Sequence, residues 1–183
     1  MGNKHNVDIV SNCGVENIVC TGNGKSKSGL TLKDDTKSFC LIDIDKLLKD
    51  NKVYKGKRCD YIIATKDRKQ NGCGICIFVE MKGKKLKSAV DQLVETYKRK
   101  EIVLENLGKV CDNPTFKHAF GSGAGHYAAA AYGGSVSTTR AQADRDKCFS
   151  QLNNEFRGYF IGRKLCLRFD KDGGKDGGRI VKQ

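Results

Sequence analysis

The chain has 183 residues, of which 34 are lysine or arginine and 21 are aspartate or glutamate, so its formal charge is +13. The length fits one domain with a small appendage, and an apolar fraction of 38% can bury a core, which excludes a wholly disordered chain. No apolar stretch of about 18 residues exists, and the N-terminus lacks the apolar region of a secretory signal. We therefore expect a cytoplasmic protein.

The nine cysteines are odd in number and scattered, without the even framework of a small secreted scaffold. We expect reduced thiols that mostly fill the core as small apolar side chains. The positive charge predicts a polyanionic partner, because Lys and Arg side chains near phosphates release bound counterions. No basic amphipathic helix with exposed Trp or Phe is evident, so nucleic acid is favoured over an anionic membrane.

The first forty residues are polar and glycine-rich, and their pattern does not settle their secondary structure. Residues 38–44 are expected to form a strand. The apolar runs at 59–64 and 75–82 predict two more strands, and the polar loop between them suggests antiparallel neighbours. The second run is apolar almost throughout, which is typical of a strand buried on both faces.

Between residues 84 and 107, apolar residues recur at helical spacing, with charged residues around the other side, which predicts an amphipathic helix. Lys85, Gln92 and Arg99 are seven residues apart and form a stripe along one side of it. Two interpretations of this stripe stay open: it follows a nucleic-acid backbone, or it is an ordinary solvated helix face.

A further strand is expected at 115–120, after which the C-terminal part of the chain is less regular. The segment 121–139, with four consecutive alanines between tyrosines and glycines, has no amphipathic pattern and is expected to be a flexible loop. We expect a helix over 140–156 and a strand over 159–169. Residues 170–183 are glycine-rich and charged, which predicts a frayed tail.

The residues that bear chemistry end the strand at 75–82. They are Glu80 and Lys82, with Asp60 twenty positions before Glu80. Side chains i and i+2 of a strand point to one face, so Glu80 and Lys82 project together, and Asp60 can approach Glu80 if the strands are neighbours. Two carboxylates make a hard oxygen site that suits Mg²⁺, and the lysine can hold the attacking water. Together these groups meet the needs of phosphodiester hydrolysis, in which a metal generates hydroxide and stabilises the developing charge.

The spacing of Glu80 and Lys82 is by itself a weak signal, because acid-x-lysine occurs at three other places in the chain. Only this pair ends an apolar strand, follows a strand with an acid at its start and precedes a long helix. The alternative is a structural salt bridge at the sheet edge, which on a surface contributes about 0–1 kcal/mol. Ending a doubly buried strand with such a pair costs desolvation that a structural pair seldom repays, which favours the functional interpretation.

This arrangement resembles the PD-(D/E)XK nuclease superfamily, which has the restriction-endonuclease-like fold. The resemblance covers about residues 40–120. It implies an α/β fold with a mixed central β-sheet flanked by helices, with Asp60 and Glu80 as ligands of Mg²⁺ or Mn²⁺ and Lys82 as the catalytic lysine. The matching segments are Cys59-Asp60-Tyr61-Ile62-Ile63, Phe78-Val79-Glu80-Met81-Lys82-Gly83 and Ser88-Ala89-Val90-Asp91-Gln92-Leu93.

The chain departs from the family pattern at two places. Cys59 stands where a proline often precedes the first acid, and Gln92 and Tyr97 are one residue further apart than in the Gln-x3-Tyr motif of RecB-like nucleases. Gln92 is therefore carried over as an assisting catalytic residue, and Tyr97 is not. Many members place a glutamate on the first helix near the metal, and Glu16, the only glutamate before Glu80, is the candidate for this additional acid.

We interpret the chain as one nuclease-like domain over residues 1–169 that cleaves DNA in restriction or phage defence, as a homodimer or as a subunit of a defence complex. Two alternatives stay open: a structure-selective nuclease of the Holliday-junction type, and a catalytically silent nucleic-acid-binding subunit. The basic residues expected to contact nucleic acid are Lys84, Lys85, Arg99, Arg140 and Arg145.

Overall fold

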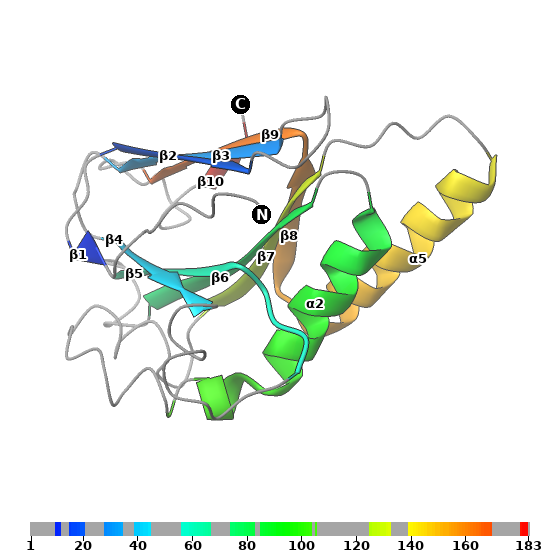
Figure 1. The fold of residues 1–183 in the computed structure, drawn as a ribbon, viewed down its shortest axis with the longest axis horizontal. Coiled ribbons are helices and arrows are strands. Elements are labelled where there is room, and N and C mark those ends of the chain that lie inside the picture. Colours follow the sequence, from blue (N-terminus) through cyan, green and yellow to red (C-terminus); the bar gives the residue numbers. More distant parts are fainter. Residues whose placement is uncertain are drawn as a thin grey trace.

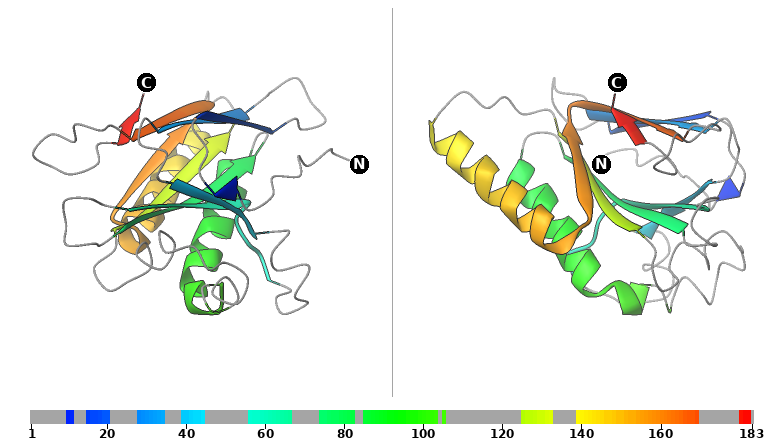
Figure 2. Two further views of the ribbon diagram at one scale, coloured as in Figure 1. Left: turned by 90° about the vertical axis from the view of Figure 1, so that its left-hand side faces the viewer. Right: turned by 180° about the vertical axis from the view of Figure 1, so that it is seen from behind.

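The described part of the computed structural model contains two β-sheets and two long helices in three layers (Figure 1). The six-stranded sheet lies in the middle, between the helices on one face and the four-stranded sheet on the other, as two further views show (Figure 2). The structure describes residues 10–11, 15–20, 28–34, 39–44, 56–66, 74–82, 85–103, 105, 125–132, 139–169 and 180–182.

The six-stranded sheet has the order β1-β4-β5-β6-β7-β8 and is mixed. The pairs β1-β4, β4-β5 and β5-β6 are antiparallel, whereas the pairs β6-β7 and β7-β8 are parallel. The antiparallel pairing of β5 with β6 confirms the predicted neighbours. The strands are β1 (Val10–Ser11), β4 (Phe39–Asp43), β5 (Tyr61–Lys66), β6 (Gly74–Lys82), β7 (Gly125–Tyr132) and β8 (Gly158–Gly162).

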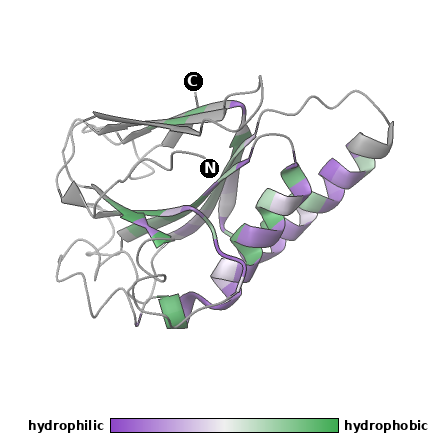
Figure 3. Ribbon diagram, in the orientation of Figure 1, coloured by the Kyte–Doolittle hydropathy of each residue, from purple (hydrophilic) through white to green (hydrophobic). Residues whose placement is uncertain are grey.

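Two helices make the connections between the parallel strands. Helix α2 (Leu86–Lys98) links β6 to β7, and α5 (Thr139–Glu155) links β7 to β8. The buried residues of α2 recur three or four positions apart, so one face of the helix packs on the sheet, as its sequence pattern predicts. In α5 the buried residues lie in the last two turns, and its earlier turns are exposed and hydrophilic (Figure 3).

The four-stranded sheet has the order β10-β9-β3-β2 and covers the other face of the central sheet. Its strands β3 and β9 are parallel, and the outer pairs are antiparallel. A second sheet therefore lies where the resemblance implies helices, so helices flank only one face. The strands are β2 (Val15–Cys20), β3 (Ser28–Asp34), β9 (Lys164–Phe169) and β10 (Ile180–Lys182).

Strand β6 is buried on both faces, which explains its almost continuous apolar sequence. Cys76 and Phe78 pack against the helices, whereas Ile77 and Val79 pack against the four-stranded sheet. Each face contributes its own hydrophobic cluster, and both clusters extend across β5 and β7. Because side chains two residues apart on a strand share a face, Glu80 lies on the helix-facing side of β6 with Cys76 and Phe78.

The prediction of a flexible loop over residues 121–139 is wrong, because the alanine run forms β7 in the interior of the central sheet. Ala128 and Ala130 pack on the helix side, and Ala129 and Ala131 pack on the side of the other sheet. The sequence of β7 does not alternate between apolar and polar residues because both faces of the strand are buried. Its small alanine side chains let the helices on one side and the four-stranded sheet on the other pack closely against it.

Two further predictions near the C-terminus need correction. The strand expected over 159–169 is two strands in different sheets, β8 and β9, separated by a bend at Arg163. Residues 180–182 form β10 rather than a frayed tail, because they pair with β9.

The helix expected over 140–156 is confirmed as α5, and the strand expected at 115–120 lies outside the described residues.

The helix expected over residues 84–107 is confirmed as α2, but its regular part is shorter. It ends at Lys98, with a turn at Arg99 and further helical residues at 100–103. Among the described residues, no helix is both long and apolar enough to span a membrane.

The burial of β7 yields a stability prediction. Ala130→Leu should lower the free energy of unfolding by about 1–3 kcal/mol, because the larger side chain has no space between the sheet and α2. Ala143→Leu on the exposed part of α5 is the matched control and should change it by less than about 0.5 kcal/mol. Urea unfolding measures both variants, and equal effects would contradict the packing of β7.

Candidate active site

Residues 56–60 lead into β5 and are fixed against helix α2 by two side chains one helical turn apart. The side-chain amide of Gln92 donates to the carbonyl oxygen of Arg58 (2.8 Å), and the N–H of Cys59 donates to the hydroxyl of Thr96 (2.7 Å). The Thr96 hydroxyl donates in turn to the carbonyl oxygen of Gln92 (2.7 Å). This clamp sets the backbone immediately before Asp60.

Asp60 lies at the start of β5, beside the end of β6. Its Oδ2 accepts a hydrogen bond from the N–H of Met81 (2.8 Å), and its carbonyl oxygen accepts one from Ile44 (3.1 Å). Tyr61 pairs with Val79 in the antiparallel ladder, so Asp60 lies across from Glu80. The structure therefore brings the two predicted carboxylates together.

Glu80 is fully buried, with 0% of its side chain exposed, and Lys82 lies over it. The Lys82 ammonium is 2.6 Å from Oε1 of Glu80, and 31% of the Lys82 side chain is exposed. Apart from this ammonium and the backbone of Asp60, no described group makes a hydrogen bond to either carboxylate oxygen. Burying a carboxylate charge with so few partners costs free energy, and binding a cation or a proton would reduce this cost.

The pKa of Glu80 reflects this environment. Burial raises it most, the negative charge of Asp60 raises it further, and Lys82 lowers it without offsetting these effects, so the pKa is about 8. The same burial, together with the charge of Glu80, raises the pKa of the neighbouring Cys59 thiol far above its ordinary value. Cys59 is therefore an unreactive filler, and Glu80 is the group that changes charge.

The donor set fits a hard divalent cation better than a transition metal. Within the described residues, no group of three or more His, Cys, Asp or Glu side chains is arranged to hold a metal ion. Mg²⁺ needs only one or two carboxylates because it keeps several waters, and Asp60 and Glu80 supply that number. The orphaned oxygen of Glu80 offers one coordination position, and the Lys82 ammonium now occupies the cationic position beside the other.

The predicted assisting residue Gln92 lies beside the site, and its amide is used on the backbone before Asp60. Thr96, which completes this clamp, was missed by the sequence reasoning. The signal for it was present, since Thr96 follows Gln92 by four residues and so shares its helix face. Tyr97, one position later, instead contacts His126 through its hydroxyl and Nδ1 (3.2 Å).

His126 pairs with Cys76, four residues before Glu80 in the parallel register, so it lies about 13 Å along the strands from the site. It packs with Tyr97 and Phe78, and burial lowers its pKa. These contacts indicate a neutral packing role. Cys59, Cys76 and Cys148 are free and buried, in agreement with their predicted role as core fillers.

Glu16, the candidate for an additional acid, lies on strand β2 and not on a helix. It pairs with Leu32 of β3 in the four-stranded sheet. The expectation that Glu16 lies on a helix is therefore wrong, because residues 15–20 form a strand in an antiparallel ladder. The strand was hidden in a polar, glycine-rich stretch with few apolar residues to show its period.

The predicted nucleic-acid contacts are dispersed. Lys85 is exposed at the start of α2, and Arg99 lies at its other end, about 20 Å away, where it pairs with Glu95 (3.6 Å). Arg145 lies over the ring of Phe149, 4.9 Å from its centroid, on exposed α5. Arg140 is in the first turn of α5, and Lys84 lies outside the described residues. Lys85 follows Lys82 of the candidate site by three residues.

Comparisons with known proteins give no match to this chain among family models, curated proteins or solved structures.

The raised pKa of Glu80 yields a pH prediction for the metal-free protein. Unfolded Glu80 titrates near 4.5 and the folded group near 8, so stability from its protonation is full below pH 4.5 and is lost as pH rises to about 8. Glu80→Gln removes this loss. In EDTA, its unfolding free energy relative to wild type should therefore rise by about 1.4 kcal/mol per pH unit between pH 6 and 8.

Urea unfolding at pH 6, 7, 8 and 9 measures this difference. Glu95→Gln on the exposed side of α2 is the control, and its difference from wild type should not vary over the same range. A constant difference for Glu80→Gln would show that Glu80 is already ionised at pH 6.

Proposed function

We propose that this protein is a metal-dependent nuclease that hydrolyses phosphodiester bonds in DNA and has a restriction-endonuclease-like core. The observation that supports it best is the convergence of Asp60, Glu80 and Lys82 at the ends of adjacent antiparallel strands. The mixed sheet and the helix that follows β6 agree with what the resemblance implies. A role in restriction or phage defence is part of the same proposal.

The residues divide the chemistry between them. Asp60 and Glu80 would hold Mg²⁺ or Mn²⁺, which when bound lowers the pKa of water and stabilises charge on the phosphate. Glu80 must lose its proton to serve as a ligand, which its pKa of about 8 allows near neutral pH. The ammonium of Lys82, partly exposed, then turns from Glu80 toward the substrate, where it orients the attacking water and offsets phosphate charge.

Gln92 and Thr96 act in this proposal as positioning residues. They touch the backbone of Arg58 and Cys59 and not the reacting atoms. Because Asp60 follows directly, their hydrogen bonds fix the direction from which its carboxylate approaches Glu80. Catalytic geometry of this kind requires such support, since small displacements of a catalytic group are costly in rate.

The second candidate is a catalytically silent nucleic-acid-binding subunit, and the complete burial of Glu80 behind Lys82 favours it. In that case the ion pair is permanent and only closes the end of the sheet. The two candidates differ in whether a divalent cation can displace the Lys82 ammonium from Glu80.

The test is incubation of the full chain with plasmid, linear duplex and four-way-junction DNA, with Mg²⁺, Mn²⁺ or EDTA in parallel. We expect cleavage with either metal and none with EDTA. Glu80→Gln and Lys82→Ala should each reduce the rate at least about 100-fold, since each removes a group that acts in the transition state. Preference for the junction would identify the structure-selective alternative.

Glu95→Gln is the matched control for Glu80→Gln and should cleave like wild type. Thermal unfolding gives an independent readout: Mg²⁺ or Mn²⁺ should raise the Tm of wild type and not that of Glu80→Gln. DNA binding without cleavage and without a metal-induced Tm shift would favour the silent subunit, and undiminished cutting by pure Lys82→Ala would falsify the catalytic assignment.

A further inference from the structure

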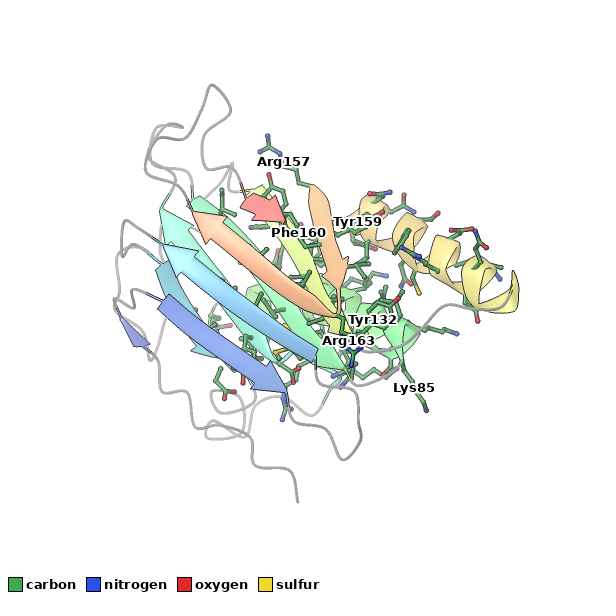
Figure 4. The ribbon with its side chains drawn as sticks, turned by 90° about the horizontal axis from the view of Figure 1, so that it is seen from above. Lys85, Tyr132, Arg157, Tyr159, Phe160 and Arg163 are labelled. Carbon is green, nitrogen blue, oxygen red and sulfur yellow. The ribbon has the colours of Figure 1, made fainter. Side chains whose placement is uncertain are left out.

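The three parallel strands β6, β7 and β8 end together at the edge of the sheet that contains Glu80 and Lys82. Lys82 pairs with Tyr132, the last residue of β7, and Ala131 pairs with Gly162, the last residue of β8. Arg163 follows at the bend, beside Tyr132. Viewed from above the sheets, Tyr132 and Arg163 lie close together (Figure 4), and Lys85 follows Lys82 by three residues at the start of α2.

Tyr132 lies on the side of the sheet used by the candidate active site. Ala130 on β7 packs with the helix-side cluster, and side chains two residues apart on a strand point to one face. Tyr132 therefore shares the face of Glu80 and Lys82, and Arg163 lies next to it at the bend that follows β8. The sequence did not predict that Tyr132 and Arg163 lie beside Lys82, because residues 121–139 were expected to form a loop and this placement requires strand β7.

The charges of this row are available to a ligand. Arg163 and Lys85 are exposed, and no described carboxylate forms an ion pair with either of them. The first turn of α2, which begins next to Lys85, contains no acidic residue. Lys98 and Arg99, at the other end of α2, instead have acidic partners in Glu155 and Glu95.

We propose that Arg163, with Tyr132 and Lys85, forms a phosphate-contacting row along which the DNA backbone leaves the active site toward β8. This inference rests on the proposed function and names the path of its substrate. Strands β6 and β8 are about 10 Å apart, with β7 between them, so Arg163 contacts a phosphate close to the scissile one and not the scissile phosphate itself.

The chain offers a matched control in Arg157. It precedes β8 as Arg163 follows it, it is exposed like Arg163, and it lies at the opposite end of the strand (Figure 4). Its backbone N–H donates to the carbonyl oxygen of His126, which a side-chain substitution leaves intact. Arg157→Ala and Arg163→Ala therefore remove the same charge from the same strand at different distances from the site.

The experiment measures binding of a fluorescent 20-base-pair DNA duplex by anisotropy in EDTA, where no cleavage occurs, over a series of salt concentrations. Arg163→Ala should weaken binding at least about fivefold and reduce the slope of log affinity against log salt by about 1. Lys85→Ala should act in the same direction, and Arg157→Ala should stay within twofold of wild type. Thermal unfolding of each variant checks that the fold is kept.

The outcomes separate this inference from the proposed function. Equal losses for Arg163→Ala and Arg157→Ala would overturn the row, because they would mean that only total charge matters, whereas cleavage by wild type would still support the nuclease. A selective loss for Arg163→Ala without any cleavage would support the row and overturn the nuclease. A selective loss seen with an RNA duplex and not with DNA would overturn the assignment of DNA as the partner.

Discussion

The buried carboxylate of Glu80 is the constraint on which the rest of the structure depends. It ends a strand that is covered on both faces, where a charge is expensive, and among the described residues the ammonium of Lys82 is the cation that pairs with it. Asp60 adds a second negative charge across the ladder, which makes the position less favourable still. A sheet that served only to fold would gain by replacing Glu80 with an apolar residue of similar size.

The remainder of the site is built to keep this costly arrangement in place. The clamp of Gln92 and Thr96 holds the approach to Asp60, and the amide of Met81 fixes the Asp60 carboxylate beside β6. Each contact joins a segment that is distant in sequence to helix α2 or to β6. These hydrogen bonds, each worth about 1 kcal/mol, partly offset the free-energy cost of burying Glu80 beside Asp60.

The sequence predicted best where period and context were strong. The antiparallel pair β5 and β6, the helix α2 and the approach of Asp60 to Glu80 all follow from apolar period and the alternation of side chains. It failed where the period was absent: the alanines of β7 carry no polar face because both sides are buried, and the hairpin β2-β3 lies in polar sequence. The roles of Thr96 and Arg163 depend on contacts between elements that are distant in sequence, and the sequence of a single chain does not show such contacts.

The corner at Arg163 has a consequence for how the molecule can be divided. Here the chain passes from the last strand of the central sheet straight into β9, whose neighbours are β3 and β10. The segment that resembles a nuclease is thus inseparable from the N-terminal hairpin, since Leu30 and Leu167 seal the apolar underside of the strand that bears Glu80. A fragment cut to residues 40–120 would leave the apolar face of β6 uncovered and would lack both β7 and β8.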